Sequence, residues 1–162
     1  MACVTWCQYA GDIPDKADPN SKLFEWSITL STFSNWFSNE VLGIFEGETP
    51  TIPTTLYAGV CSDASSASSA GTELSGGGYA RVPVTFERVS DIKRWNPSIV
   101  VFPAATAEWT AGSFTLWDDA NPGQGNYYAY GNLAGSVTVA ISEAIRFPAE
   151  TGIIIGMGST VT

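Results

Sequence analysis

Apolar and polar residues alternate along much of this chain, which is the pattern of half-buried β-strands. The first such segment is 23–30, in which Glu25, Ser27 and Thr29 take one face. The apolar face consists of Phe24, Trp26, Ile28 and Leu30. This pattern predicts a strand whose apolar face packs either on its own domain or on a neighbouring subunit.

The spacing of apolar residues lengthens from two to three or four directly after this strand. A helix is therefore predicted from Ser31 to about Leu42, with Ser31 or Thr32 as its N-cap and Gly43 as its stop. Its apolar stripe consists of Phe33, Trp36, Phe37 and Val41. Such a stripe packs in a protein core more often than in a partner's groove, so we expect it to be core.

Two more strands are predicted on either side of a loop rich in Ser, Ala and Gly. Residues 55–61 form the first strand, and residues 79–86 form the second, in which Arg81 faces out. Pro83 cannot donate a ladder hydrogen bond, so the second strand lies at a sheet edge or contains a bulge. The loop, 62–78, is expected to be flexible, and its three consecutive glycines lack the Lys-Ser/Thr pair of a phosphate-binding loop.

The second half of the chain is a succession of short strands separated by Pro, Gly, Asn and Asp. These strands are predicted at Ile99–Phe102, Phe114–Trp117, Tyr127–Leu133, Val137–Ile141, Ala144–Phe147 and Ile153–Met157. About nine strands and one helix favour a mostly β fold: an antiparallel, jelly-roll-like β-sandwich with one short α-helix in its N-terminal half. Residues 1–22 lack periodicity and are predicted to be an N-terminal arm, and residues 23–162 a single β-sandwich domain.

The composition narrows the classes of partner. Sixteen acidic and seven basic residues give a formal net charge of -9, which disfavours binding to nucleic acid phosphates. Charged residues are only 14% of the chain, well under the usual quarter, so we expect much of the surface to lie against other protein. No segment approaches the ~20 apolar residues of a membrane span, so we expect a soluble protein without a membrane partner.

Several kinds of catalytic and metal site are disfavoured by residue type. The chain has no histidine, which removes His-based triads and His metal sites. Its three cysteines, Cys3, Cys7 and Cys61, follow no secretory signal and are interpreted as free thiols in a reducing cytosol. Metal binding by Cys3 and Cys7 is the alternative, but no second cysteine pair completes such a site. No cofactor is therefore expected.

The candidate catalytic groups have structural explanations. Asp118 and Asp119 are neighbours, so in a strand they point to opposite faces and do not form a glycosidase pair. They precede Asn121-Pro122-Gly123, which indicates a turn. The serines of 62–76 have no base beside them, so we expect no enzymatic activity.

Two clusters leave binding functions open. Arg88, Lys93 and Arg94 form a basic cluster, mixed with Glu87 and Asp91, which is either a solvated loop or a salt-bridging contact to an acidic neighbouring subunit. An aromatic cluster consists of Trp109, Trp117, Tyr127, Tyr128 and Tyr130. Alternation puts Tyr128 and Tyr130 on one face and Tyr127 on the other. These aromatics either divide between sandwich core and surface or form a platform for sugar rings.

The order of these parts resembles a known family over about residues 31–157. The motifs are the opening helix, the Pro53-Thr54-Thr55-Leu56-Tyr57 segment, the Gly-rich loop, Gly78-Tyr79-Ala80-Arg81-Val82, Val101-Phe102-Pro103-Ala104-Ala105-Thr106-Ala107-Glu108-Trp109, Phe114-Thr115-Leu116-Trp117-Asp118-Asp119-Ala120 and Tyr130-Gly131-Asn132-Leu133. The family comprises small tailed-phage virion proteins, labelled head decoration or tail fibre proteins. The chain departs from it in its N-terminal extension, residues 1–30, and in the strand after Trp109, which lacks the polar, His-containing version of relatives.

This resemblance implies a non-enzymatic structural protein of the virion. We expect a capsid cement or decoration protein, made in the host cytoplasm, that binds the major capsid protein on the capsid surface as a homotrimer. The alternative is a tail-associated module that binds a receptor or a host surface glycan. Candidate subunit or capsid contacts are Trp6, Tyr9, Phe24, Trp26, Ile28, Arg88, Lys93 and Arg94.

Overall fold

The computed structural model describes residues 23–25, 28–30 and 32–156, and the fold is mostly β with one α-helix, as predicted. The helical elements are α1 (Asn35–Gly43) and the 3-10 helix η1 (Ile44–Glu46). The strands are β1 (Leu23–Glu25), β2 (Ile28–Leu30), β3 (Thr32–Phe33), β4 (Leu56–Cys61), β5 (Val82–Val84), β6 (Glu87–Ser90), β7 (Lys93–Trp95), β8 (Val100–Val101), β9 (Trp109–Trp117), β10 (Tyr127–Val139), β11 (Ala144–Phe147) and β12 (Ile153–Gly156). The predicted arm, residues 1–22, lies outside the described residues.

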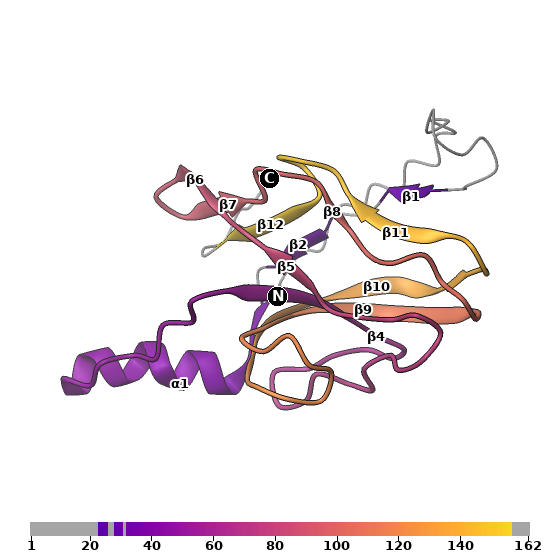
Figure 1. Ribbon diagram of the computed structural model, residues 1–162. Helices are drawn as coiled ribbons and strands as arrows, with labels where there is room; N and C mark the ends of the chain where they lie inside the picture. The colour runs from indigo at the N-terminus through magenta and orange to yellow at the C-terminus, as the bar shows by residue number, and fades with distance from the viewer. Residues whose placement is uncertain (1–22, 26–27, 31, 157–162) are drawn as a thin grey trace.

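The strands form three sheets in two layers (Figure 1). One layer is the five-stranded sheet β3-β10-β9-β4-β5, and the other contains β1-β11-β8 and β2-β12-β7-β6. Pairing is antiparallel except for β1 on β11 and β2 on β12, which are parallel. The antiparallel sheets match the prediction, and the jelly-roll topology stays a prediction. No helix among the described residues is long and apolar enough to cross a bilayer.

Aromatic side chains join the two layers of the core. Phe114 on β9 and Phe147 on β11 have ring centroids 4.8 Å apart, and Phe102 lies 6.3 Å from Phe147. All three rings are buried, together with aliphatic residues from both layers. Edge-to-face packing of this kind adds to the free energy of burying the apolar surface.

The helix begins later than its apolar spacing predicted. Thr32 and Phe33 pair with β10 as strand β3, so the chain is still extended there. Ser34 is the N-cap: its hydroxyl accepts a hydrogen bond from the Phe37 amide at 3.0 Å and donates to the Tyr127 carbonyl at 2.6 Å. The cap expected at Ser31 or Thr32 is therefore wrong, because pairing with β10 carries the strand to Phe33.

The strand predicted over 23–30 is divided. β1 adds to β11 and β2 adds to β12, and these two strands belong to different sheets. A single half-buried strand with one apolar face therefore does not form, since each half takes a different edge. Conversely, the two strands predicted at 127–133 and 137–141 join into the long strand β10, with a register shift between Asn132 and Val137.

Strand β5 confirms the expectation drawn from Pro83. It is shorter than predicted, with only three residues, and it lies at the edge of the five-stranded sheet. Past the end of β5, residues of the 62–78 loop and Tyr79 bond the edge of β4. The Leu74 amide donates to the Val60 carbonyl at 3.0 Å, and the Val60 amide donates to the Tyr79 hydroxyl at 2.9 Å. The edge of β4 is thus bonded over its length and offers little for pairing with another chain.

Cys61 on β4 is a free, buried cysteine. Burial raises the pKa of its thiol to about 11, although the Thr115 hydroxyl beside it acts in the opposite direction. Because the thiolate is the nucleophile, we expect the native Cys61 to resist thiol reagents at pH 8. In a chain carrying Cys3→Ser and Cys7→Ser, so that Cys61 is the remaining thiol, a thiol reagent should label the native protein at least ~10-fold more slowly than the same protein unfolded in urea.

The raised pKa of the Cys61 thiol also makes the stability of the fold depend on pH. A thiol whose folded pKa lies above its unfolded value stabilises the fold below the unfolded pKa, and this contribution is lost as the pH rises through about 11. The free energy of unfolding should therefore fall between pH 9 and pH 11 by more in this chain than in its Cys61→Ser variant. In the labelling experiment, equal rates for native and urea-unfolded protein would contradict a buried, protonated Cys61 thiol.

Candidate functional site

Arg81 was expected to face out from a strand, but its side chain is fully buried. Strand β5 begins only at Val82, so the alternation that predicted an exposed arginine does not extend to it. Its Nε donates to Glu73 Oε1 at 2.7 Å and its Nη2 donates to Glu73 Oε2 at 2.8 Å. The guanidinium carbon lies 3.9 Å from the centroid of the Trp117 ring, which adds a cation–π contact.

The Arg81–Glu73 pair also holds two loops on the outer face of the five-stranded sheet. Arg81 Nη1 donates to the carbonyls of Asp119 and Gln124, at 2.6 and 2.9 Å. The Gly123 amide donates to Glu73 Oε2 at 2.9 Å. Because Glu73 lies in the 62–78 loop and the other partners lie in the loop after β9, one ion pair fixes both loops.

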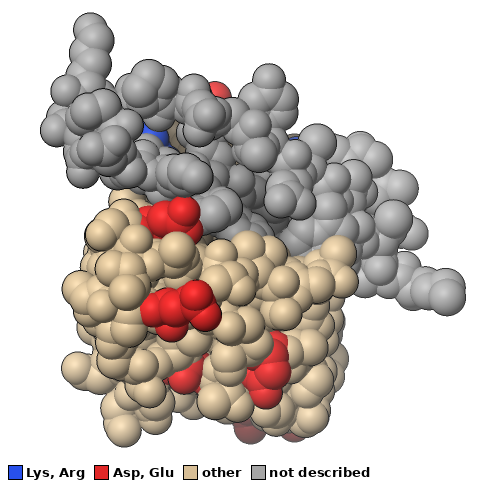
Figure 2. Space-filling model, turned by 90° about the vertical axis from the view of Figure 1, so that its right-hand side faces the viewer, with Lys and Arg blue, Asp and Glu red and all other residues tan. Residues whose placement is uncertain are grey.

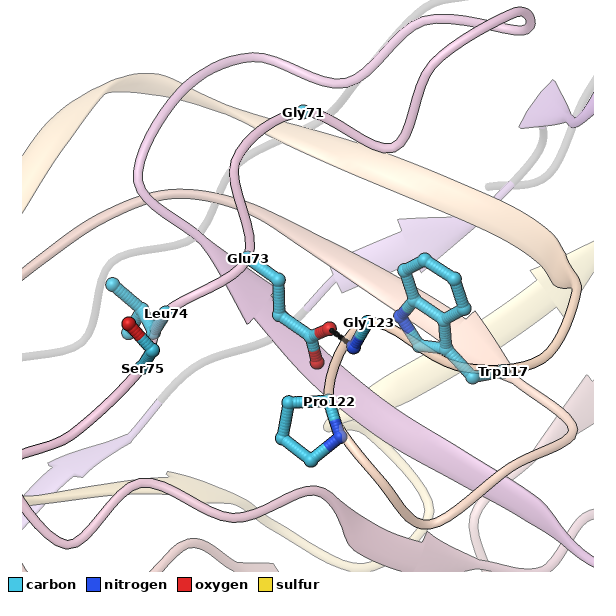
Figure 3. A pocket seen from close by; sticks show the side chains of 7 residues that line it. All are labelled: Gly71, Glu73, Leu74, Ser75, Trp117, Pro122 and Gly123. Carbon is cyan, nitrogen blue, oxygen red and sulfur yellow. Dashed lines mark hydrogen bonds between the residues drawn. The ribbon is translucent and has the colours of Figure 1, made fainter.

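A pocket of about 350 Å³ opens beside this pair (Figure 3). Its lining residues are Gly71, Glu73, Leu74, Ser75, Trp117, Pro122 and Gly123. Each Glu73 oxygen already accepts two hydrogen bonds, one from Arg81 and one from the Tyr79 hydroxyl or the Gly123 amide. Burial raises the pKa of the Tyr79 hydroxyl, as does the Glu73 charge, so the phenol stays a proton donor. The carboxylate of the pocket is therefore occupied by internal bonds, which favours a structural role.

Asp118 and Asp119 organise the loop after β9, as the turn interpretation predicted. Asp118 accepts hydrogen bonds from the Asn126 amide and side chain at 2.7 and 3.0 Å. Asp119 accepts one from the Asn121 amide at 2.7 Å, which is an Asx-turn. Both carboxylates thus close turns within one loop.

The loop 62–78 has a defined hydrogen-bonded conformation, unlike the flexible segment that its composition suggested. Ser65 is buried; its hydroxyl lies 2.7 Å from that of Ser113 on β9, and its amide donates to Asn132 at 2.7 Å. Gly77 has φ +57°, and a Cβ there would lie 2.5 Å from Trp109 Nε1. Small residues are needed here because the loop packs closely on the sheet.

The aromatic cluster is arranged differently from its predicted alternation. A register shift between Tyr127 and Ala129 turns Tyr128 inward, where its ring lies 5.0 Å from Trp36 and 5.2 Å from Phe37. Tyr127 and Tyr130, predicted on opposite faces, have ring centroids 6.5 Å apart. A bulge reverses the alternation, so the predicted assignment of faces is wrong.

Large apolar side chains are exposed where α1 and η1 end, far from the two-layer body (Figure 1). We call this surface the apolar tip; it consists of Leu42, Ile44, Phe45 and Ile52. Phe45 is 86% exposed, an unusual position for a phenylalanine. The segment after η1 is tied to the helix, since the Thr51 amide donates to Glu40 Oε2 at 2.8 Å. The helical stripe predicted from the sequence did not include the tip; the signal for it was the Ile-Phe pair that follows Gly43.

The predicted basic cluster lies on the hairpin of β6 and β7. Arg88 pairs with Asp91, and Arg94 Nη1 donates to the carbonyls of Ser90 and Lys93 at 2.7 and 2.9 Å. The Arg88 side chain is 66% exposed, so its ion pair is a weak surface pair. We call this surface the basic hairpin; it consists of Arg88, Val89, Ile92, Lys93 and Arg94, of which Val89 and Ile92 are exposed apolar residues. The three basic residues belong to one hairpin, and both interpretations of their cluster stay open.

The remaining candidate contacts cannot be placed on these surfaces. Trp6, Tyr9 and Trp26 lie outside the described residues. Phe24 and Ile28 belong to β1 and β2, which lie at two sheet edges. No group of three or more Cys, Asp or Glu that could hold a metal ion occurs within the described part of the chain.

Comparison with known proteins identifies the family. A family model described as podophage GP4 fiber I protein gp80 matches residues 32–154, which is most of the chain. A search of curated proteins finds no match. The family match confirms the resemblance to phage virion proteins and supports a non-enzymatic structural role in the virion. The chain therefore belongs to the podophage GP4 fiber I protein gp80 family, a family of phage structural proteins.

Proposed function

We propose that this protein is a fibre-type structural subunit of a phage particle, attached through contacts between protein surfaces. The observation that carries the proposal is the apolar tip, which projects from the domain on a helix. Exposed apolar area is unfavourable in water by ~25 cal/mol per Å², so a group of large apolar side chains on a projecting element is typical of an interface. The description of the family as a fibre protein supports the fibre assignment.

A head cement role is the second candidate, with the major capsid protein as partner. The observation that favours it is an uncharged surface: in Figure 2 the described part of one face is mostly uncharged, with scattered acidic side chains. Such a surface suits a protein that covers its neighbours through many weak apolar contacts repeated by symmetry. A homotrimer is proposed for either role.

Fewer aromatic side chains are accessible for binding a host glycan than the sequence suggested. Trp109, Trp117 and Tyr128 are buried, so a platform for sugar rings would depend on Tyr127 and Tyr130. Tyr127 is also engaged, since its hydroxyl donates to the Ser66 carbonyl. If the purified protein bound defined glycans on an array, and a Tyr130→Ala variant did not, the receptor-binding alternative would replace a purely structural role.

The location of the protein in the particle tests the proposal directly. We expect gold-labelled antibodies against the domain to decorate purified virions at the tail, at the positions of fibres. Label spread over the head lattice would instead support the cement role. The matched control is a particle assembled without this gene, which should show no label. If virions assembled with the gene present contained none of the protein, both structural roles would be overturned.

A further inference from the structure

The apolar tip carries an acidic rim. Glu40 lies on α1, Glu46 on η1, and Glu48 two residues after η1, so all three are close in the chain to the exposed side chains of the tip. The sequence has no Lys or Arg anywhere from residue 32 to residue 80. A partner for this surface therefore needs exposed apolar side chains surrounded by basic ones.

The basic hairpin has that chemistry. Val89 and Ile92 are exposed, and Arg88, Lys93 and Arg94 lie beside them. Glu87 and Asp91 belong to the same hairpin, and Asp91 pairs with Arg88, so three basic residues stand against two acidic ones. The other basic residues of the described part are Arg81, which is buried, and Arg146, whose Nε is buried. Among the described residues, the basic hairpin is therefore where accessible positive charge is concentrated. β6 is also an edge strand with all four residues exposed, so the hairpin is open to a partner.

We propose that the apolar tip of one copy docks on the basic hairpin of a second copy of this chain. The apolar side chains of the two surfaces would be buried against each other, and the acidic rim would face the basic side chains. A chain of net charge -9 repels its own copies, so self-association requires opposite charges to meet locally. The inference deepens the proposed function, on which its role in the particle rests.

Symmetry limits the assemblies that this contact can build. The tip and the hairpin are different surfaces of one copy, and both lie toward the left end of the molecule in Figure 1. Such a contact builds a reciprocal two-fold pair, a ring, of which a trimer is one example, or an open filament where the rotation does not close. The molar mass of the oligomer in solution distinguishes these arrangements.

The first test places a charge in the apolar tip. We expect sedimentation equilibrium of the full chain to show a defined oligomer, and Ile44→Lys to raise its dissociation constant at least ~10-fold, since docking would bury an ammonium group against the basic hairpin. The matched control is Ile141→Lys. Ile141 is 63% exposed and Ile44 is 52% exposed, but Ile141 lies in the turn between β10 and β11, at the other end of the sandwich. The control should leave the dissociation constant unchanged, and circular dichroism should show that both variants are folded.

The second test reverses the charges. Glu46→Lys with Glu48→Lys, and separately Arg88→Glu with Lys93→Glu, should each weaken the oligomer. Added salt should weaken the original contact by screening attraction, and strengthen either variant's contact by screening repulsion. The chain that carries all four substitutions should recover an affinity close to the original, because opposite charges face each other again.

Three results would overturn the inference. They are a full chain that stays monomeric at about 100 µM, oligomers that Ile44→Lys leaves intact, and no recovery in the fourfold variant. If the Ile44→Lys protein were missing from particles but still self-associated as the unchanged chain does, the tip would instead bind a different virion protein. The position of the antibody label on virions does not depend on these measurements, so failure of this inference and failure of the proposed function are distinguishable.

Discussion

Replacing Arg81 with methionine is expected to lower the free energy of unfolding by about 3–5 kcal/mol, the usual effect of breaking a buried ion pair. Methionine fills part of the same volume but removes every donor. The Glu73 side chain, only 10% exposed, then keeps its charge without its cation, and the carbonyls of Asp119 and Gln124 lose their donor. Trp117 also loses the cation over its ring.

Urea unfolding followed by tryptophan fluorescence measures this loss. The matched control is Arg88→Met, because Arg88 pairs with Asp91 on the surface and its removal should change the free energy of unfolding by no more than ~1 kcal/mol. Combining Arg81→Met with Glu73→Leu should recover part of the stability, since no uncompensated charge remains. Equal effects at positions 81 and 88 would show that the Arg81–Glu73 pair does not hold the loops.

Limited proteolysis would report which part of the structure opens. The loop after β9 is attached through Asp119, Gly123 and Gln124, all of which bond the Arg81–Glu73 pair. In Arg81→Met this loop should be cut first, while the wild-type chain resists under the same conditions. The sheet itself should survive, because its ladder hydrogen bonds do not involve the pair.

Local pattern predicted the elements of this fold better than their ends. Short apolar or alternating runs placed β4, β11 and β12 correctly, because burial decides the conformation of these segments. Local pattern failed at Ser34 and at 127–130, where the deciding interactions are with distant segments: a strand pairing that delays the helix, and a bulge that turns Tyr128 inward. Neither the partner strand nor a bulge is visible in a window of ten residues.

The candidate surfaces also differ in how far local sequence could predict them. The basic cluster could be predicted because its residues are close in the sequence, but the hairpin of β6 and β7 that holds them was not predicted. The Arg81–Glu73 pair was missed because a single arginine between apolar residues looks like the outer face of a strand, and its partners come from two loops. The apolar tip was missed because large apolar residues at a helix end are counted as core until the fold shows that nothing covers them.

The core contains the second substitution with a large expected effect, Phe147→Ala. Phe147 is 0% exposed, and its ring contacts Phe114 and Phe102, so its loss leaves a cavity between the two layers. We expect the free energy of unfolding to fall by about 3–5 kcal/mol, and by less in Phe147→Leu, which refills much of the volume.

Phe45→Ala is the matched control, because it makes the same substitution at a side chain that is 86% exposed. At protein concentrations below the oligomer's dissociation constant it should change the unfolding midpoint little, since the isolated copy already leaves this ring in water. At higher concentrations it should lower the midpoint, because self-association stabilises the folded state by mass action and Phe45 belongs to the apolar tip. A Phe45→Ala effect as large as that of Phe147→Ala at low concentration would mean that the tip is part of the domain's own core. A difference that appears only as the concentration rises would separate the residues that build this domain from those that join it to its neighbours.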